Sequence, residues 1–422
     1  MTEVQVRENK RFYGVWIVVG IWLVYFLAAP PGSYASSIIS THIVGERGWS
    51  ESVIGMATSI FYLSMALISI PTSILIRRKG IRFTIVVGAT IGIVSYVFTA
   101  FFAVSSGIYV TAFGGIGISS SMCAIVTGST AINTWYDRNK AVPMSILITA
   151  GGIGGFILPM LVSYLLDYGA VYCWLVFIAM DMIVIIVAVF MLKDKPEDIG
   201  EIRDGYQWTR AHPMTQVEKK ISQQEEPPIR YCYRTKQFAI VSVQVFIGRA
   251  ANAAVTSYVI VYVIQHGVSA LQAGLLITLY NAASLVGRFS VGLLDRYIKQ
   301  QYINALALGL VAAECVMLHF AGGYGSFCIS VLLGGCGFGA LCTLFPLLVA
   351  NYFGKENFSF LNGIFNTIGT LGSFVSPMLI FAVAQALGGY HTSYMLVGII
   401  VLLIAVIACF SPVTLIKVDK KK

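Results

Sequence analysis

Twelve stretches of twenty or more mostly apolar residues follow one another along this 422-residue chain, with little polar sequence between them. A helix needs about 20 residues to cross the ~30 Å hydrocarbon core of a bilayer, so each stretch can span a membrane. Only 11% of the residues are charged, whereas soluble domains need about 25% to build a water-exposed surface. The sequence therefore predicts an all-α membrane protein with twelve transmembrane helices.

The twelve stretches form two sets of six, separated by a polar segment that includes the run Glu225-Glu226-Pro227-Pro228. The first set lies at residues 14–41, 52–76, 82–104, 108–135, 140–166 and 171–192, and the second at 237–265, 270–294, 300–320, 324–353, 357–387 and 391–414. We therefore expect an N-terminal six-helix bundle at 1–192 and a cytoplasmic linker at 193–236. A C-terminal bundle with a short basic tail is expected at 237–422.

The positive charges predict the orientation of the chain in the membrane. If both termini are cytoplasmic, 25 of the 28 Lys and Arg residues lie in the inner loops, the linker and the tails. Arg47 alone then falls outside, while Arg249 and Arg288 fall within helices. Because enrichment of Lys and Arg marks the cytoplasmic side, both termini are predicted to be cytoplasmic. The same distribution explains the net charge of +9 without a nucleic-acid partner.

The features of an enzyme are missing from the sequence. The eight cysteines stand singly, no pair of histidines has metal-ligand spacing, and no nucleotide-binding GxxxxGK[ST] run occurs. We expect no metal, no cofactor and no enzymatic activity. A membrane sensor that binds solute without carrying it remains an alternative, although a linker of about 44 residues is too short for an ordinary output domain.

Motifs in the inner loops resemble those of the major facilitator superfamily. Residues 73–82, SILIRRKGIR, are similar to its loop signature GxLxDRxGxR, with departures at Ser73 and Arg77. Residues 287–296 resemble the second copy of that signature, one residue short, and residues 135–141 resemble the segment that opens the fifth helix. The resemblance implies two pseudo-symmetric six-helix bundles that alternately open a central solute site to either side of the membrane.

Three further stretches resemble the oxalate–formate antiporter and monocarboxylate transporter branch of that superfamily. They are KDKPEDIGEIRDG at 193–205, Asn351–Gly354 and Gly48–Ser50. The branch implies a secondary active transporter of a small organic anion, of the lactate, pyruvate or formate type, driven by a proton or a counter-anion. An oxalate or dicarboxylate exchanger is the alternative. We expect a monomer in a prokaryotic inner membrane, with a eukaryotic plasma membrane as the other setting.

Two arginines within helices are the strongest candidates for binding an anion. An arginine at mid-helix costs about 2.5–3.5 kcal/mol on insertion scales, so such residues usually face a cavity or a partner. Arg249 and Arg288 both lie deep in predicted spans, and the planar guanidinium matches a carboxylate. Arg288 falls where the resembled branch carries its substrate-binding arginine, whereas Arg249 matches no position of the family.

Helical spacing places polar residues on the same faces as these arginines. We expect Asn252 beside Arg249 and Asn281 beside Arg288 to line the solute path. Two candidates on other helices are Asn366 and Tyr34, the latter next to a proline pair that should kink the first helix. Hydrogen bonding between helices is the alternative role for these side chains.

Proton coupling cannot use the residues of the resembled branch. The acidic residue that the branch carries one turn before its helix 8 arginine is Ser284 in this chain. Two acids remain within helices, Asp181 on the sixth and Glu314 on the ninth. They are candidates for proton coupling, with a structural role as the alternative.

Overall fold

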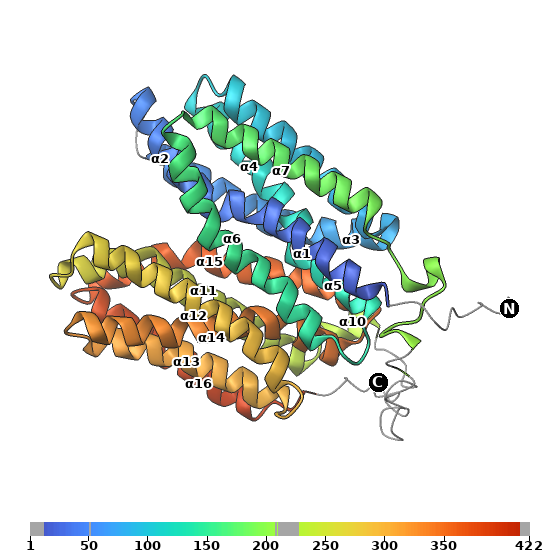
Figure 1. The fold of residues 1–422 in the computed structure, drawn as a ribbon. Coiled ribbons are helices and arrows are strands. Elements are labelled where there is room, and N and C mark those ends of the chain that lie inside the picture. Colours follow the sequence, from blue (N-terminus) through green and yellow to red (C-terminus); the bar gives the residue numbers. More distant parts are fainter. Residues whose placement is uncertain (1–11, 50–51, 207–208, 210–227, 414–422) are drawn as a thin grey trace. The chain divides into compact units, whose positions relative to one another are not determined.

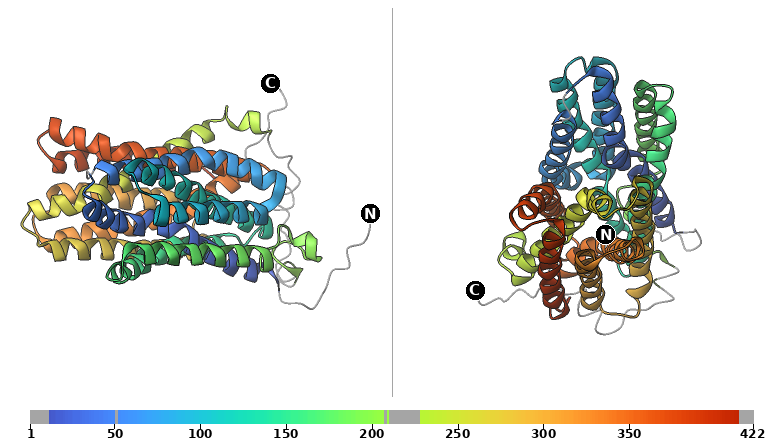
Figure 2. Two further views of the ribbon diagram at one scale, coloured as in Figure 1. Left: turned by 90° about the horizontal axis from the view of Figure 1, so that it is seen from above. Right: turned by 90° about the vertical axis from the view of Figure 1, so that its left-hand side faces the viewer.

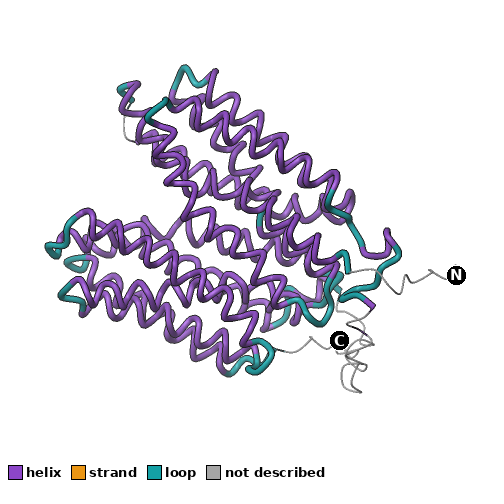
Figure 3. The backbone as a smooth tube through the Cα atoms, viewed as in Figure 1, coloured by secondary structure: helices purple, strands orange, loops and turns teal. Residues whose placement is uncertain are grey.

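The computed structural model describes residues 12–49, 52–206, 209 and 228–413. Within these ranges the chain forms helices joined by short loops and no strand, which confirms the predicted all-α class (Figure 3). The described residues form two compact units. The predicted basic tail, Pro227 of the linker and Ser50 lie outside the described residues.

The first unit comprises the described residues up to Thr235 together with Val349–Ile364 (Figure 1). Two π-helical segments, η1 and η2, and one 3₁₀ turn, η3, interrupt its helices. The elements are α1 Gly14–Pro30, η1 Pro31–Ala35, α2 Ser36–Arg47, α3 Ser52–Val97, η2 Phe98–Phe102, α4 Ser106–Cys123, α5 Ile125–Trp135, α6 Ala141–Leu166, α7 Ala170–Phe190, η3 Pro196–Ile199 and α10 Ile229–Cys232.

The second unit comprises Lys236–Leu348 and Phe365–Val413. Its long helices run alongside one another, and two of them, α14 and α15, begin or end in the first unit (Figures 1 and 2). The helices are α11 Lys236–Gln265, α12 Ala270–Leu294, α13 Gln300–Phe320, α14 Tyr324–Phe353, α15 Phe358–Ala386 and α16 Tyr390–Cys409.

One helical run in the first unit contains two of the predicted spans. The run from Val53 to Phe102 has 50 residues, more than twice what a bilayer requires. The chain turns within it at Gly80, where φ is 89° and ψ is 173°. Only glycine adopts this conformation without strain. Of the described helices, eleven are long and apolar enough to cross a membrane, and counting this run as two gives the twelve predicted spans.

Two other spans are not continuous α-helices. The first passes from α1 into the π-helical η1 at the proline pair next to Tyr34, where the sequence predicts a kink. The predicted span 108–135 is found as one span, but within it Ala124 separates α4 from α5 with φ −98° and ψ −136°. No glycine or proline stands at that position to announce the break.

The segment after α7 folds back onto helix ends of the first unit, where two of its carboxylates cap helix starts and a third binds a loop. Asp194 accepts hydrogen bonds from the amides of Ile81 and Arg82, at 2.6 and 3.1 Å, just after the Gly80 turn. Glu201 accepts from the amide of Tyr13, at 3.0 and 3.2 Å, where α1 begins. These bonds satisfy amide groups that have no partner inside their own helices.

The third carboxylate, Asp204, binds the loop between α5 and α6. Its carboxylate accepts from the backbone amides of Asp137, Arg138 and Asn139 at 3.1, 2.9 and 3.4 Å. Its own amide donates to the carbonyl of Trp135 at 3.1 Å. The residue is buried, and it is the one non-glycine residue of the described chain with a positive φ, 62°. The acidic segment 193–205 therefore anchors the helices that start on the cytoplasmic side.

Glycines hold the helices of the second unit close together. A Cβ built on Gly339 of α14 would lie 2.0 Å from the carbonyl oxygen of Ser284, and one on Gly287 of α12 would lie 2.0 Å from that of Cys336. No side chain fits between backbones at this spacing, which is how small residues pack membrane helices. The close contact fixes α12, and with it Arg288, against α14.

Candidate functional site

Arg249 lies on α11 against the middle of α15. Its Nη2 donates to Oδ1 of Asn366 at 3.4 Å, so the structure brings together two residues that the sequence analysis named separately. Asn366 is buried, and Arg249 is half-buried. Gly369 allows this approach, because a Cβ there would lie 3.1 Å from Cγ of the arginine. The partner of the guanidinium is a neutral amide, which leaves its positive charge uncompensated by that contact.

A tyrosine joins the polar face of α11 to that of α12. The hydroxyl of Tyr280 donates to Oδ1 of Asn252, which lies one turn beyond Arg249 on α11. Tyr280 also lies within electrostatic range of Arg288, two turns further along α12. The two predicted polar faces therefore meet inside the second unit through this side chain.

Arg288 is buried, with only 5% of its surface exposed. Burial of a guanidinium in a membrane span is costly unless polar or charged groups surround it. One turn before it, the hydroxyl of Ser284 is buried and makes no hydrogen bond to another described residue. A hydroxyl in this state retains a donor and an acceptor that a polar ligand can use.

Glu314 is fully buried on α13, behind Tyr280. Neither carboxylate oxygen has a hydrogen-bond partner among the described residues. The absence of a side chain at Gly334 of α14 makes room for the carboxyl group, because a Cβ there would lie 1.7 Å from Oε2. Glu314 also lies within electrostatic range of Tyr280 and of Tyr394 on α16. Tyr280 thus interacts both with Glu314 and with the group that contains Arg288 and Asn252.

Asp181 occupies a similar position in the first unit but has different neighbours. It is buried on α7, and its carboxylate oxygens have no hydrogen-bond partner in the described structure. A Cβ built on Gly92 of α3 would lie 2.1 Å from Oδ2. The groups around it are Ser119, Cys123 and Tyr96. None of these is a candidate for anion binding.

Two predicted site residues are not joined to this group. Among the described residues, no hydrogen bond links half-buried Asn281 to either arginine. Tyr34 lies in the π-helical η1 of the first unit, and its side chain is outside the described part of the structure. Both stay predictions.

The sequence analysis missed Tyr280, although a signal for it was present. Tyr280, Ser284 and Arg288 follow one another at spacings of four residues, which places them on one helical face. The neighbouring Asn281 is the more conspicuous candidate, because an amide is rare in a membrane span, whereas tyrosine is common in apolar stretches.

A second charged group lies at the cytoplasmic end of the first unit. Lys355 pairs with Asp137 at 2.5 Å, and buried Lys140 donates to Oδ1 of Asn133 at 3.3 Å. Burial lowers the pKa of Lys140 to about 8, and the positive charge of Lys355 adds to that shift. Asp137 opposes it and favours the charged amine. Lys140 therefore titrates within reach of physiological pH.

One protein-family model matches most of the chain. The model described as Major Facilitator Superfamily matches residues 21–377 and 241–421. The nitrite extrusion protein of Bacillus subtilis is 25% identical over 373 residues, covering 85% of each chain. The MFS transporter asaE of Aspergillus flavus is 24% identical over 268 residues, and this chain spans about half of that relative, 55%.

The same fold appears in solved structures. A variant of the Escherichia coli fucose:proton symporter FucP matches with a TM-score of 0.72 and 15% identity, over 95% of this chain and 99% of the symporter. FucP in the outward conformation matches with a TM-score of 0.69, also at 15% identity and over the same shares of the two chains. At this identity the likeness establishes the fold alone.

Proposed function

We propose that this chain, which belongs to the Major Facilitator Superfamily, carries a small organic anion, most simply a monocarboxylate of the lactate, pyruvate or formate type. Membership of the family makes it a multi-pass secondary active transporter of the cell membrane and not an enzyme. A sensor that binds without transport is therefore superseded. The anion, the branch of monocarboxylate carriers and the coupled species are the proposed part.

The neutral partner of Arg249 carries the proposal. A guanidinium in the middle of a membrane span is retained where it has a function, and its contact with Asn366 supplies a dipole and no negative charge. A carboxylate can approach the free edge of the fork and form a charge-assisted pair with it. The amide of Asn366 would then help to orient the bound group.

Arg288 supplies a second positive charge to the same region of the second unit. It lies on the helical face that holds Ser284 and Tyr280, and Tyr280 connects that face to Asn252. A monocarboxylate would engage one arginine directly and the second through its field. A dicarboxylate such as oxalate would engage both, so an exchanger of dicarboxylates is the alternative within this class.

The buried acids are candidates for carrying the coupled proton. Glu314 is the stronger of the two, because Tyr280 lies within electrostatic range of both Glu314 and Arg288. A proton on this acid would neutralise one charge near the site and so change how strongly an anion is held. Asp181 has no comparable connection among the described residues and is assigned a structural role in packing α7 against α3.

Nitrite is a further candidate anion. The Bacillus subtilis relative is named a nitrite extrusion protein and aligns over 85% of this chain. Nitrite has one negative charge and two oxygens in a plane, as a carboxylate has, and a guanidinium fork binds both shapes. The arginines alone do not separate these two substrates.

Transport into liposomes tests the proposal. Purified protein would be reconstituted with unlabelled anion inside, and entry of labelled lactate, formate, oxalate or nitrite would be followed with and without a proton gradient. The matched variants are Arg288→Ala, Arg249→Ala and, as a control at an exposed cytoplasmic position, Arg296→Ala. We expect uptake of at least one carboxylate, lost in the two membrane variants and kept in the control.

The pattern of uptake decides among the alternatives. Uptake of nitrite alone would replace the carboxylate by nitrite, and strong preference for oxalate would favour the exchanger. Entry that needs internal anion indicates exchange, whereas entry driven by the proton gradient indicates symport. No uptake of any of these anions, or uptake unaffected by both arginine variants, would refute the proposed function.

A further inference from the structure

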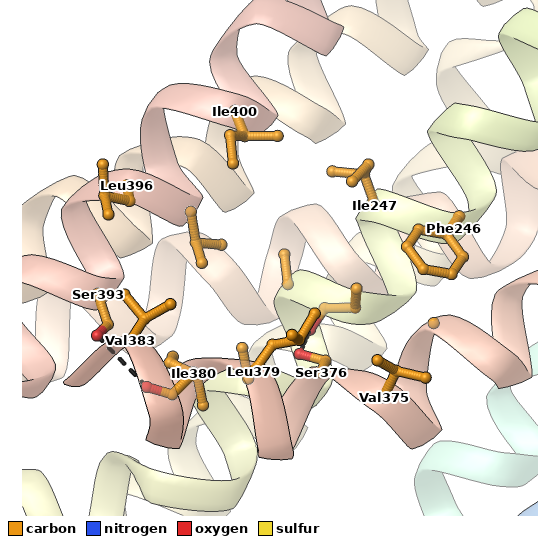
Figure 4. Close-up of a pocket in the computed structure, with 15 residues that line it drawn as sticks. Phe246, Ile247, Val375, Ser376, Leu379, Ile380, Val383, Ser393, Leu396 and Ile400 are labelled. Carbon is orange, nitrogen blue, oxygen red and sulfur yellow. Dashed lines mark hydrogen bonds between the residues drawn. The ribbon is translucent and has the colours of Figure 1, made fainter. Parts of the chain in front are cut away.

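An apolar groove lies between α11, α15 and α16 of the second unit (Figure 4). Its volume is about 280 Å³, close to the lower end of the roughly 300–1,000 Å³ found for small-molecule pockets. Phe246 and Ile247 of α11, Leu379 of α15 and Leu396 of α16 are among the side chains that line it. Leu379 and Leu396 are exposed at 56% and 40%, so the groove is open at its mouth.

The polar atoms of the groove are already satisfied. The hydroxyl of Ser376 donates to the carbonyl of Ala250 at 2.6 Å, and that of Ser393 donates to the carbonyl of Ile380 at 3.4 Å. No charged residue lines the groove. A water molecule would find too few polar partners to be held there. The occupant must therefore be apolar.

The groove faces away from the candidate anion site. On α11, Arg249 and Asn252 form the polar face, whereas the groove is lined by Phe246, Ile247, Ala250, Ala251 and Ala254. With about 100° of rotation per helical residue, the centres of these two faces lie roughly 160° apart. The three helices are membrane spans. The exposed mouth therefore opens to the hydrocarbon of the bilayer and not to the solute path.

The shape and depth of the groove match a lipid chain of the outer leaflet. Its lining on α15 runs from Gly372 to Val383, about 16 Å at 1.5 Å per residue. With both termini cytoplasmic, α16 starts at the outer surface, and its lining residues Ser393 to Ile400 lie in its outer half. The groove thus extends along the helices from near the midplane toward the outer surface.

An aromatic group lies at the outer end of the groove, with one residue from each of its three helices. The ring of Tyr258 is stacked 5.1 Å from that of Tyr390 and 6.2 Å from that of Phe381. Tyrosines prefer the boundary between hydrocarbon and head groups, where the ring is apolar and the hydroxyl is wet. This group places two hydroxyls where the ester region of a phospholipid would lie.

We propose that this groove binds one acyl chain of an outer-leaflet phospholipid, whose glycerol ester region lies at Tyr258 and Tyr390. Lipid tails are as apolar as the groove, so the hydrophobic effect contributes nothing to the binding of an acyl chain from the bilayer. Retention rests on van der Waals contact with a preformed surface that would otherwise be a void. The bound chain fills the seam between α11 and α16 and is independent of which anion is carried.

Photochemical labelling in bilayers tests the site. The protein would be reconstituted with a trace of phosphatidylethanolamine that carries a diazirine in mid-chain, irradiated, and digested for mass spectrometry. We expect adducts to be several-fold enriched on the groove residues of α15 and α16, relative to exposed membrane-facing residues such as Leu402 and Val406. Adducts distributed evenly over all exposed apolar faces would overturn the proposal.

Two groove-filling variants and one matched variant make the test specific. Ala250→Phe and Ile247→Trp add bulk inside the groove, whereas Ala382→Phe adds the same phenyl ring at an exposed position of α15 outside it. The first two should lower groove labelling several-fold, and Ala382→Phe should leave it unchanged. Equal loss in all three would show that bulk anywhere disturbs labelling and would overturn the site.

Competition identifies the source of the chain. An excess of unlabelled phosphatidylethanolamine should reduce groove labelling, while the same excess of free fatty acid should not. If free fatty acid competes equally well, the groove holds an isolated acyl chain and the assignment to a phospholipid fails. Variants with Tyr258→Phe and Tyr390→Phe should weaken the phospholipid's labelling alone, because they remove the hydroxyls at the ester region and keep the rings.

Discussion

The guanidinium of Arg249 on α11 contacts the side-chain amide oxygen of Asn366 on α15 at 3.4 Å, and the two residues are 117 positions apart in the sequence. The distance is longer than the 2.7–3.2 Å of an ordinary N–H···O bond, so the contact is weak. A carboxylate that replaced it would form a shorter, charge-assisted bond. On the proposed function, the pair exchanges this internal contact for the transported anion.

This relationship predicts different effects for two substitutions. Arg249→Lys keeps the charge and loses the planar fork, so the KM for the transported anion should rise about tenfold, the equivalent of ~1.4 kcal/mol. Asn366→Ala removes one neutral contact and should raise KM by a few-fold, with little change in maximal rate. The concentration dependence of anion counterflow measures both. Equal losses in the two variants would mean that Asn366 orients the arginine and does not contact the anion.

Glu314 should separate proton coupling from anion binding. Glu314→Gln keeps the shape of the side chain and cannot exchange a proton, so proton-driven uptake should be lost while anion counterflow persists. Asp181→Asn is the matched variant in the first unit and should retain both activities, because no candidate site residue contacts it. The measurement is uptake with and without an imposed pH gradient, beside counterflow under equal pH.

The opposite results would be equally informative. If Glu314→Gln loses counterflow and proton-driven uptake together, the acid serves the structure of α13 and not coupling. If Asp181→Asn loses the response to the pH gradient, the coupling acid lies in the first unit. If the wild type showed no anion counterflow at all, the anion-carrier proposal itself would be refuted.

The number of spans could be predicted because it is a local property of the sequence, whereas their orientation stays a prediction. Apolar length alone selects a membrane span, and the position of Lys and Arg selects its direction. The break at Ala124 could not be predicted, since no glycine or proline stands within three residues of it. A helix broken by its packing, and not by glycine or proline, leaves no mark in the sequence.

The candidate site was predictable by residue type but not by pairing. An arginine or asparagine within an apolar span is conspicuous in any sequence. The residues identified by this criterion are Arg249, Asn252, Asn366 and Arg288. The contact of Arg249 with Asn366 depends on how α11 crosses α15, which the close approach at Gly369 determines. Likewise, nothing local revealed that Asp204, 67 residues beyond Asp137, would bind the loop that leads into α6.

Lys140 predicts a pH dependence of stability. Its pKa is about 8 in the folded protein against 10.5 for the free side chain. Between these values the unfolded chain binds a proton that the folded chain has released, so Lys140 adds stability as the pH rises from about 8 to about 10.5. The largest effect is roughly 3 kcal/mol, reduced by whatever water reaches the amine.

The substitution Lys140→Met isolates the contribution of this buried amine to the free energy of unfolding. Lys140→Met should unfold at a higher temperature than the wild type at pH 7, because it removes the cost of a buried charge, and this advantage should vanish by pH 10. Thermal unfolding of the detergent-solubilised protein, followed by tryptophan fluorescence, measures it. Lys299→Met, at an exposed lysine, is the control and should show no such trend. A pH-independent difference for Lys140→Met would contradict the buried-charge explanation.

Asp204 combines a loop-binding carboxylate with a positive φ, and three substitutions separate the two effects. Asp204→Ala loses the acceptors for the amides of Asp137, Arg138 and Asn139 and also strains the backbone, so it should cost about 2–4 kcal/mol. Asp204→Gly loses the acceptors without the strain and should be about 1 kcal/mol less damaging. Asp204→Asn keeps a neutral acceptor and tolerates the conformation, so it should be the mildest. The three apparent melting temperatures rank these costs. If glycine proved as stable as the wild type, the carboxylate would contribute nothing and the segment 193–205 would not anchor the start of α6.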